Sequence, residues 1–455
     1  MREIICLEHA DDVQVCGNKA ATLAGLKKKG LLIPEGAVIT TEYFYDFVLQ
    51  NGMTAEEVDN IKSSESMEYR KLSEVLKKGK WSKALYEDMK RLYDAVPHPL
   101  CVRSSGTTED GTVASMAGYY HSCVNVRNFS EFLSAVKECW LSAFHPQIIA
   151  QLNKLNLSCR PIPLLVQNFQ PSVVSGVAFY TKDRVIISST YGLCTGVVSG
   201  NTVCDEYVWN REDGEWNKRI AYKDKCYLQI SYEQQGKFGS SRYFFVKWKN
   251  GVYQEFELKG TNNDFSVGLC VIMNNPPQDI RCMPVLTDDE LERVKGWLRN
   301  ISEKLNIANL DCDWCLDAEG TIHLLQARPF LADKFSRPGK RKRELQESEY
   351  QGVAISQGVH VGKVVHYRRE SDKEKINQGD VVLLEVIPDD FIDIISHVGA
   401  IVLRSEVLLS HCAIIAREWG IPCIGGIELE KFNNGDLCKV DGENGVIGLM
   451  TPENK

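Results

Sequence analysis

The sequence predicts an α+β protein with a large first part and a smaller second part. A chain of 455 residues is long enough for two or three domains, each with its own hydrophobic core. Its 44% hydrophobic and 25% charged residues are those of an ordinary soluble globular protein. From residue 352 onward the composition changes to short β runs separated by glycine turns. We therefore expect a domain boundary shortly before that point.

The overall charge and the cysteines narrow the class of protein. A net charge of −8 argues against nucleic acid as the main partner but leaves room for a local basic pocket for phosphates. The sixteen cysteines are scattered, the N-terminus carries no apolar signal segment, and no window approaches a membrane span. We therefore expect a cytoplasmic protein with reduced thiols and no membrane partner. Cys312 and Cys315, the one C-x-x-C pair, lack a second pair for zinc and are expected to flank Trp314 on a strand.

The first predicted helix follows a glycine turn. Gly17 opens the turn, and the alanine- and leucine-rich residues 20–26 favour a helix. Lys19 falls in the first helical turn, where a cation is unfavourable unless an anion lies beside that helix end. Lys19 is therefore either a phosphate-binding residue or a solvated surface residue, and its position alone favours the second.

A short strand ending at Arg103 leads into a loop over residues 104–122 that is dense in hydroxyl groups and glycines. Glycines let the backbone approach a charged ligand closely, and successive N–H groups can surround an anion. Arg103 would supply a planar cation for phosphate oxygens. The loop either binds an anion or is merely flexible. After it, residues 129–157 are predicted to form one amphipathic helix and residues 163–169 a buried strand.

A hairpin is predicted towards the end of the first part of the chain. A capped helix over residues 286–306 is followed by strands at 311–316 and 321–329. On such a hairpin Asp313 and Gln326 can point to one face and offer two oxygen ligands to a hard cation such as Mg²⁺. An isolated Asp and Gln on paired strands would mean little without further support.

Residues 331–350 are polar and carry the basic run 340–343. A solvated hinge is the preferred interpretation of this segment, ahead of a nuclear-targeting segment or a tether for phosphate. Beyond it, a strand-like run at 399–403 precedes a short helix that starts at Ser410 and ends at Gly420.

His411 lies in the first turn of that short helix, where free N–H groups and the helix dipole favour an anion. A neutral imidazole there could attack phosphorus, and the same helix end would stabilise the phosphohistidine. The alternative is a histidine that only caps or packs, and helix position alone favours this alternative. Cys412, Ile415, Ala416 and Trp419 are spaced as one buried stripe of the helix.

The run Ser-His-Cys-Ala-Ile-Ile-Ala-Arg-Glu-Trp-Gly-Ile-Pro over residues 410–422 resembles the phosphohistidine signature of the phosphoenolpyruvate synthase and pyruvate phosphate dikinase family, to which rifampin phosphotransferases are related. The stretches at 17–41, 102–122 and 326–329 resemble the nucleotide domain of the same family. The resemblance implies an ATP-grasp nucleotide-binding domain over residues 1–330, a charged linker over 331–350 and a small β/β/α swivelling phosphohistidine domain over 351–455.

The resemblance also implies roles for individual residues. The catalytic residues would be His411 and Arg103, and Mg²⁺ would be held by Asp313 and Gln326. The positions implied to contact ATP are Lys19, Arg103, Gly118, Ser122, Gln167, Asp313, Gln326 and Arg328.

This sequence departs from the family pattern at several places. Asp313 stands where the family commonly has Glu, so metal binding is expected to survive with altered geometry. Cys194 and Thr195 replace a common Gly-Glu, and Glu406 and Val407 replace a common Gly-Gly. The second replacement indicates that the acceptor is neither pyruvate nor phosphoenolpyruvate.

The activity implied by the resemblance is that of an ATP-dependent, dikinase-type phosphotransferase. ATP would be cleaved to AMP, and a phosphoryl group would pass through His411 to a small-molecule acceptor. The C-terminal pyruvate-binding barrel of the synthases is missing from this sequence. The acceptor would therefore bind a separate subunit or a reduced pocket within these domains. Two alternatives stay open, namely the catalytic subunit of a split phosphoenolpyruvate synthase and a nucleotide-binding regulatory protein without chemistry.

Overall fold

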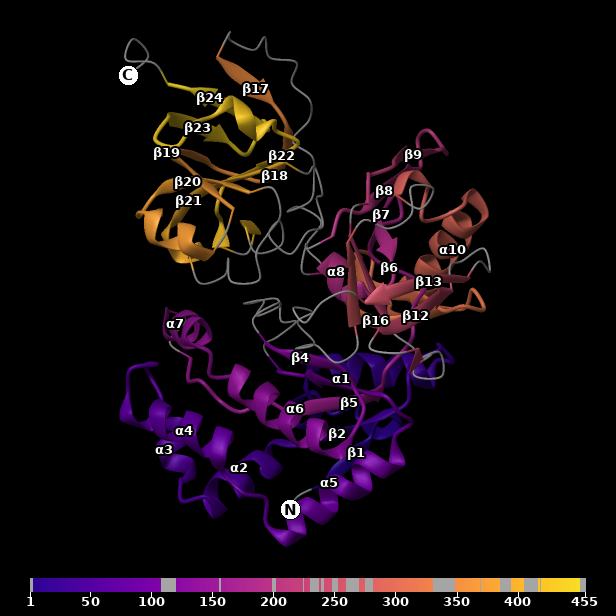
Figure 1. The fold of residues 1–455 in the computed structure, drawn as a ribbon, viewed down its shortest axis with the longest axis vertical. Coiled ribbons are helices and arrows are strands. Elements are labelled where there is room, and N and C mark those ends of the chain that lie inside the picture. Colours follow the sequence, from indigo (N-terminus) through magenta and orange to yellow (C-terminus); the bar gives the residue numbers. More distant parts are fainter. Residues whose placement is uncertain are drawn as a thin grey trace.

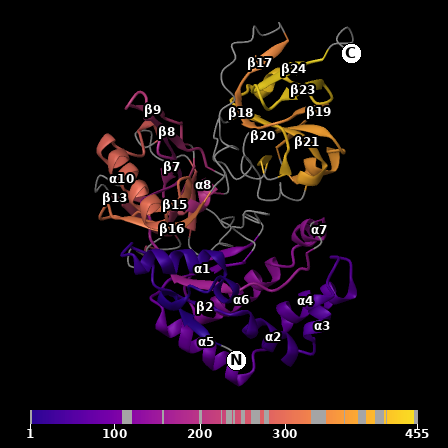
Figure 2. The same cartoon turned by 180° about the vertical axis from the view of Figure 1, so that it is seen from behind.

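The computed structural model contains three groups of elements that are separate in space (Figure 1). The described residues are 3–107, 120–154, 157–198, 202–223, 225–229, 237–238, 241–247, 253–258, 270–274, 281–329, 348–368, 370–384, 394–404, 416–417 and 419–450. We call the groups the N-terminal, central and C-terminal lobes. Seen from behind, the three lobes remain distinct (Figure 2). None of the helices in these described ranges is both long and apolar enough to cross a membrane.

The N-terminal lobe combines a five-stranded sheet with helices. The strands, in sheet order, are β1 (Ile4–Cys6), β2 (Gly36–Ile39), β5 (Leu164–Asn168), β3 (Leu100–Ser104) and β4 (Ser122–Val126). The helices are η1 (Leu7–His9), α1 (Val13–Lys28), α2 (Thr41–Gln50), α3 (Ala55–Asp59), α4 (Met67–Lys78), α5 (Lys83–Ala95), α6 (Phe129–Ser142) and α7 (Pro146–Lys154). Phe44, Phe47 and Trp140 are fully buried in its aromatic core.

The sequence prediction of one helix over residues 129–157 is wrong, because the structure has two helices, α6 and α7. Pro146 lacks a backbone N–H and clashes with a preceding helical turn, so it cannot continue α6. At the first position of a helix neither property matters, and α7 therefore begins at Pro146. The predicted buried strand at 163–169 is confirmed as β5.

The central lobe is a six-stranded antiparallel sheet covered by a long helix. In sheet order the strands are β16 (Ile322–Pro329), β15 (Leu310–Leu316), β6 (Val174–Tyr180), β7 (Arg184–Tyr191), β8 (Asp205–Asn210) and β9 (Trp216–Arg219). Its helices are α8 (Cys194–Val198) and α10 (Asp288–Leu305). The predicted capped helix is confirmed, since Thr287 and Glu290 form a complete capping box. The predicted hairpin is confirmed as β15 and β16.

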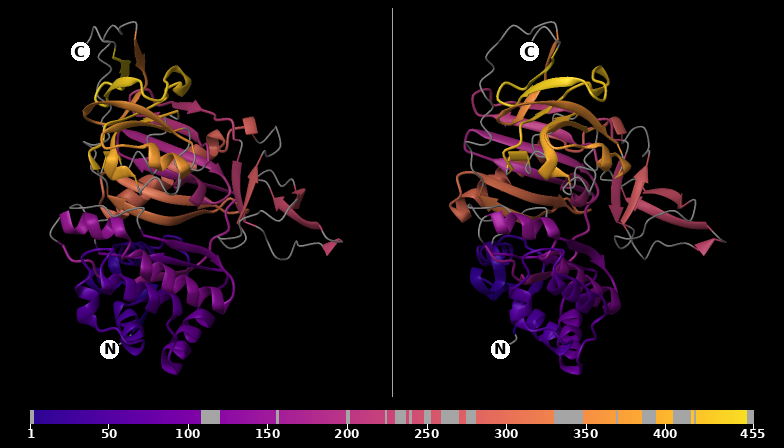
Figure 3. Two further views of the ribbon diagram at one scale, coloured as in Figure 1. Left: turned by 60° about the vertical axis from the view of Figure 1, so that its left-hand side comes forward. Right: turned by 90° about the vertical axis from the view of Figure 1, so that its left-hand side faces the viewer.

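Smaller strands extend the central lobe. They are β10 (Lys225–Gln229) paired with β14 (Cys270–Asn274), and a three-stranded sheet of β11 (Lys237–Phe238), β12 (Ser241–Lys247) and β13 (Tyr253–Leu258). The three-stranded sheet projects from the side of the molecule (Figure 3).

A buried ion pair ties β8 to the segment before α10. The Lys223 ammonium lies 2.7 Å from the Asp205 carboxylate, and neither side chain is exposed. Asp205 also accepts hydrogen bonds from the Val285 N–H at 2.7 Å and the Tyr207 hydroxyl at 3.0 Å. These bonds satisfy the buried charges, which would otherwise be costly.

The C-terminal lobe contains an eight-stranded sheet. Its order is β17 (Glu349–Gln351), β24 (Val446–Leu449), β23 (Leu437–Asp441), β19 (Val359–Tyr367), β20 (Asp380–Leu384), β21 (Val398–Leu403), β22 (Cys423–Gly425) and β18 (Val353–Ser356). Short helical turns are η4 (Glu370–Lys375), η6 (Ile395–His397) and η7 (Leu429–Lys431). The predicted strand at 399–403 is confirmed as part of β21. The exact domain boundaries at 330 and 350 stay predictions, since residues 330–347 lie outside the described part.

Candidate functional site

The chain turns sharply at Gly17, as the sequence predicts. Gly17 has φ 78° and ψ 167° within α1, and a Cβ there would lie 1.4 Å from the Ser105 carbonyl oxygen. Only glycine fits such a contact with a positive φ. Two residues later, Lys19 is buried, with 5% of its surface exposed, and its Nζ donates to the Ser104 carbonyl at 3.1 Å. Lys19 is therefore not the solvated surface residue that its helix position alone favours.

The serine after Ser104 holds the helix start against the beginning of the loop. The Ala20 N–H donates to Ser105 Oγ at 3.0 Å, and that hydroxyl donates to the Cys16 carbonyl at 2.7 Å. Ser105 thus satisfies groups on both sides of the Gly17 turn. No local pattern in the sequence predicts this role of Ser105, and its hydroxyl directly after the Arg103 strand is the one signal that points to it.

Arg103 connects the N-terminal and central lobes. It lies on β3, and its guanidinium donates to the Leu325 carbonyl at 2.6 Å and to Gln326 Oε1 at 3.1 Å, both on β16. A guanidinium presents several donors in one rigid plane, so it can make both bonds and still face a phosphate. Arg103 therefore fixes the position of one predicted metal ligand.

Asp313 and Gln326 are directly opposite each other on β15 and β16. Opposite residues of an antiparallel pair project to the same face of the sheet. Burial raises the pKa of the Asp313 carboxyl to about 6, and the charge of Asp311 adds to the rise. The positive charges of Arg103, Arg328 and Lys19 act in the opposite direction and lower this pKa in part. The cations predicted to bind phosphate thus lie within electrostatic reach of Asp313, and Arg103 also bonds to Gln326.

Arg328 is held by Asp311, which is not among the predicted site residues. Its Nε donates to Asp311 Oδ2 at 2.8 Å, and the two residues are register partners on β16 and β15. The Asp311 carboxylate aligns the Arg328 side chain and offsets part of its charge.

The donor set fits a hard divalent cation. In the part of the chain that the structure describes, no hydrogen bond or ion pair engages the Asp313 carboxylate. A partly buried carboxylate with a raised pKa and no partner is stabilised by a cation or a proton. The Gln326 amide oxygen, one lone pair of which accepts from Arg103, supplies a second oxygen ligand.

Of the remaining predicted site residues, the structure describes two and leaves two outside the described ranges. Ser122 begins β4 directly opposite Arg103. Gln167 is buried on β5, between β2 and β3, and its amide donates to the Pro34 carbonyl at 3.1 Å. Gly118 and His411 lie outside the described residues.

Residues that follow His411 link the C-terminal lobe to the N-terminal lobe by packing and to the central lobe by electrostatics. Trp419 packs against the core of the C-terminal lobe and against the core of the N-terminal lobe. Arg417 donates to the Ile355 carbonyl at 2.7 Å. Burial lowers the pKa of Arg417 to about 10, and the negative charges of Cys423 and Asp311 act in the opposite direction and raise it. Arg417 is therefore within electrostatic reach of β15.

Comparison with known families identifies two matching regions. Residues 13–349 match the family described as the pyruvate phosphate dikinase AMP/ATP-binding domain. Residues 376–445 match the family described as the mobile domain of PEP-utilising enzymes. The two matches follow the order that the resemblance implies.

Curated relatives extend beyond this chain. A probable phosphoenolpyruvate synthase of Methanothermobacter thermautotrophicus is 26% identical over 96% of this chain and 62% of its own length. The phosphoenolpyruvate synthase of Aeropyrum pernix is 28% identical over 96% of this chain and 56% of its own length. The chain thus spans 56% to 62% of these relatives. Among solved structures, the ADP complex of N5-carboxyaminoimidazole ribonucleotide synthetase aligns with a TM-score of 0.28 at 7% identity, over 74% of this chain and 51% of that one.

Proposed function

The chain belongs to the pyruvate phosphate dikinase family, and from this premise we propose that it is an ATP-dependent phosphotransferase of the dikinase type. In the proposed reaction ATP is cleaved to AMP, and a phosphoryl group passes through His411 to a small-molecule acceptor. The observation that carries this proposal is the convergence of Lys19, Arg103 and Arg328 on the paired oxygens of Asp313 and Gln326.

The cations of the site would bind the ATP phosphates. Lys19 reaches the site from α1, Arg103 from β3 and Arg328 from β16. Their side chains are held by the Ser104 carbonyl, the Leu325 carbonyl and Asp311. Because the cations are already oriented, little entropy is lost in positioning them during the reaction. When bound, Mg²⁺ would be held by Asp313 and Gln326 and would neutralise charge on the phosphates.

His411 would be the nucleophile of the first half-reaction. The lone pair of an imidazole nitrogen forms a bond to the β-phosphorus of ATP. The P–O bond to AMP breaks, and its electron pair remains on the AMP phosphate. The γ-phosphoryl group goes to water or phosphate, and the β-phosphoryl group goes on to the acceptor. The contact of Trp419 with the N-terminal lobe supports a carrier position close to the nucleotide site.

Two other functions remain as alternatives. The split phosphoenolpyruvate synthase is compatible with the names of the relatives. It predicts turnover of pyruvate only after a separate pyruvate-binding subunit is added. The regulatory protein without chemistry is favoured by Thr195 and Glu406, which depart from the family pattern. It predicts binding of ATP without phosphohistidine.

The deciding experiment uses ATP labelled separately at the β and γ positions, with Mg²⁺. The wild-type protein is expected to acquire acid-labile β label and to form AMP. His411→Ala should lose both, whereas His9→Ala, a change at an exposed histidine, should keep both. Absence of label and of AMP from the wild type would reject the dikinase proposal for this chain. Binding of ATP under those conditions would favour the regulatory protein.

A further inference from the structure

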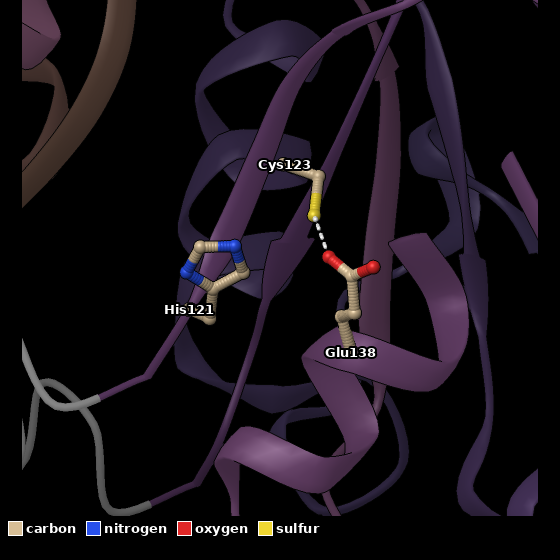
Figure 4. Close-up of side chains that lie close together, drawn as sticks. All are labelled: His121, Cys123 and Glu138. Carbon is tan, nitrogen blue, oxygen red and sulfur yellow. Dashed lines mark hydrogen bonds between the residues drawn. The ribbon is translucent and has the colours of Figure 1, made fainter. Parts of the chain in front are cut away.

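Three side chains with metal-binding chemistry meet where β4 begins. His121 directly precedes β4, Cys123 lies on the strand, and Glu138 comes from α6 (Figure 4). One ligand atom from each of the three lies within 4.8 Å of the other two. Cys123 Sγ is 3.6 Å from Glu138 Oε2. Because side chains alternate along a strand, Cys123 and Ser122 lie on opposite faces of β4.

The three side chains differ chemically from the ligands of the nucleotide site. Asp313 and Gln326 offer only oxygen, which suits Mg²⁺. A thiolate, an imidazole and a carboxylate together suit a borderline-soft divalent cation such as Zn²⁺. Zinc bonds of about 2.0–2.3 Å put tetrahedral ligands roughly 3.3–3.8 Å apart. The His121 and Glu138 side chains are exposed, so they can move inward by the small distance that remains.

The backbone that carries these ligands is already fixed. The His121 N–H donates to Ser142 Oγ at 3.0 Å, and that hydroxyl donates to the Cys139 carbonyl at 2.7 Å. The start of β4 is thereby bound to the last turn of α6. The opposite face of α6 is buried in the lobe core, so Glu138 cannot move away as part of a loose helix. Little conformational entropy is therefore lost when the three ligands are ordered around a bound cation.

We propose that His121, Cys123 and Glu138 bind a zinc-type divalent cation, separate from the Mg²⁺ of the nucleotide site. On binding, the Cys123 thiol gives its proton to solvent and the sulfur coordinates as a thiolate. Three protein ligands leave one coordination position to water, because zinc prefers four. The bound cation cross-links β4 to α6 beside the strand that carries Arg103.

The test uses Co²⁺ as a spectroscopic probe of the metal-free full-length protein. Titration should give one Co²⁺ per chain with a thiolate-to-cobalt charge-transfer band, and Zn²⁺ should displace it. Cys123→Ser should abolish the band. Glu138→Gln, a change at an exposed helix position that leaves the fold intact, should weaken binding at least about tenfold. His121→Asn should weaken it similarly.

Matched controls separate this site from other thiols and from the nucleotide site. Cys6→Ser changes another accessible free thiol, and Asp313→Asn changes the nucleotide-site carboxylate. Both variants should keep the band and its one-to-one stoichiometry. The proposal is overturned if the wild type shows no thiolate band, if the band survives in Cys123→Ser, or if Glu138→Gln binds Co²⁺ as tightly as the wild type.

Discussion

Arg103 shows how much of the site depends on the chemistry of one side chain. Its guanidinium binds a main-chain carbonyl and the amide of Gln326 across two lobes, while its charge acts on Asp313. An ammonium is a point charge on a flexible stem and cannot reproduce that planar arrangement. The choice of arginine is therefore a matter of geometry as well as charge.

Arg103→Lys is expected to lower the rate of AMP formation by about 100-fold, since it removes a preorganised cation from a phosphate site. The unfolding midpoint should fall only modestly, because lysine keeps the charge but not both bonds to β16. The measurement is AMP production from labelled ATP, with the unfolding midpoint recorded in parallel. Arg211→Lys is the control, since Arg211 is largely exposed and its ion pair with Asp183 is long, at 3.9 Å. Equal rates for Arg103→Lys and Arg211→Lys would contradict the assigned role.

The sequence predicted the cations of the site better than it predicted what holds them. A cation at a helix start or before a glycine-rich loop made Lys19 and Arg103 candidates, and the resemblance to the family decided for them against a surface lysine and a merely flexible loop. Asp311 and Ser105 did not stand out, because their partners lie 17 and 89 positions away in sequence. Such contacts depend on strand register and on the packing of separate elements, which no local pattern contains. The roles of the predicted residues towards ATP and Mg²⁺ themselves stay predictions.

At the scale of single elements, the conformation of α1 requires glycine at one position and not at another. Gly17 combines a positive φ with a contact that leaves no room for a side chain. Gly25 lies in the same helix, and a Cβ there would meet nothing within 4 Å. Substitution by alanine should therefore lower the stability of the protein at Gly17 and raise it at Gly25.

Gly17→Ala is expected to destabilise the N-terminal lobe by more than about 2 kcal/mol through strain and the clash with Ser105. Gly25→Ala should stabilise it by about 0.5–1 kcal/mol, because alanine loses less backbone entropy in a helix. Urea unfolding followed by far-UV circular dichroism measures both. A Gly17→Ala protein as stable as the wild type would show that the close approach of α1 to Ser105 is wrong.

The hairpin of β15 and β16 depends on Asp317 in its turn. The carboxylate accepts from the Thr321 N–H at 2.8 Å, the Glu319 N–H at 3.0 Å and His323 Nε2 at 2.7 Å. Burial raises the pKa of Asp317, but the bonds from His323 and the two N–H groups outweigh burial and hold the pKa below its usual 3.8. This turn sets the register of the hairpin as far as Trp314 and Leu324, and an irregularity between Asp313 and Trp314 then brings Asp313 opposite Gln326.

Asp317→Asn is expected to cost about 1–2 kcal/mol at neutral pH through its lost charge-assisted bonds. Because the folded pKa is lowered, the stabilising effect of Asp317 is present above pH 3.8 and is lost as the pH falls through the folded value. The gap in urea midpoint between wild type and Asp317→Asn should therefore shrink only in that acid range. Glu319→Gln, at an exposed position of the same turn, should show no such gap. A gap that is constant from pH 7 to pH 3 would exclude this linkage.

At the scale of the whole molecule, the sequence predicted the order of the lobes but not their contact. Trp419 was expected on the buried stripe of a short helix, and it does pack against the core of its own lobe. Its second contact, with the N-terminal lobe, joins segments more than 200 residues apart. The periodicity of one helix shows that a face is buried but not what covers it. Cys412 and Ile415, predicted on the same stripe, lie outside the described residues.

This second contact leads to a prediction about how the carrier is phosphorylated. Trp419→Ala removes a large apolar surface from the contact between the C-terminal and N-terminal lobes. A smaller fraction of the molecules should therefore be in the docked arrangement, in which these two lobes are in contact. The rate at which β label passes from ATP to the protein should fall at least about tenfold, because each 1.4 kcal/mol of lost contact is a factor of ten. The affinity of the nucleotide site for ATP should stay the same, since Trp419 belongs to the C-terminal lobe and Lys19, Arg103 and Arg328 belong to the other two lobes.

Two further variants separate docking from damage to the carrier fold. Val361→Ala changes an exposed apolar residue of the same lobe, on β19, and should label at the wild-type rate. Trp419→Phe keeps most of the apolar surface and should label at an intermediate rate. If Trp419→Ala weakens ATP binding as much as it slows labelling, the defect lies in the nucleotide site. If it labels at the wild-type rate while its carrier lobe remains folded, the docked contact is not the arrangement in which His411 meets ATP.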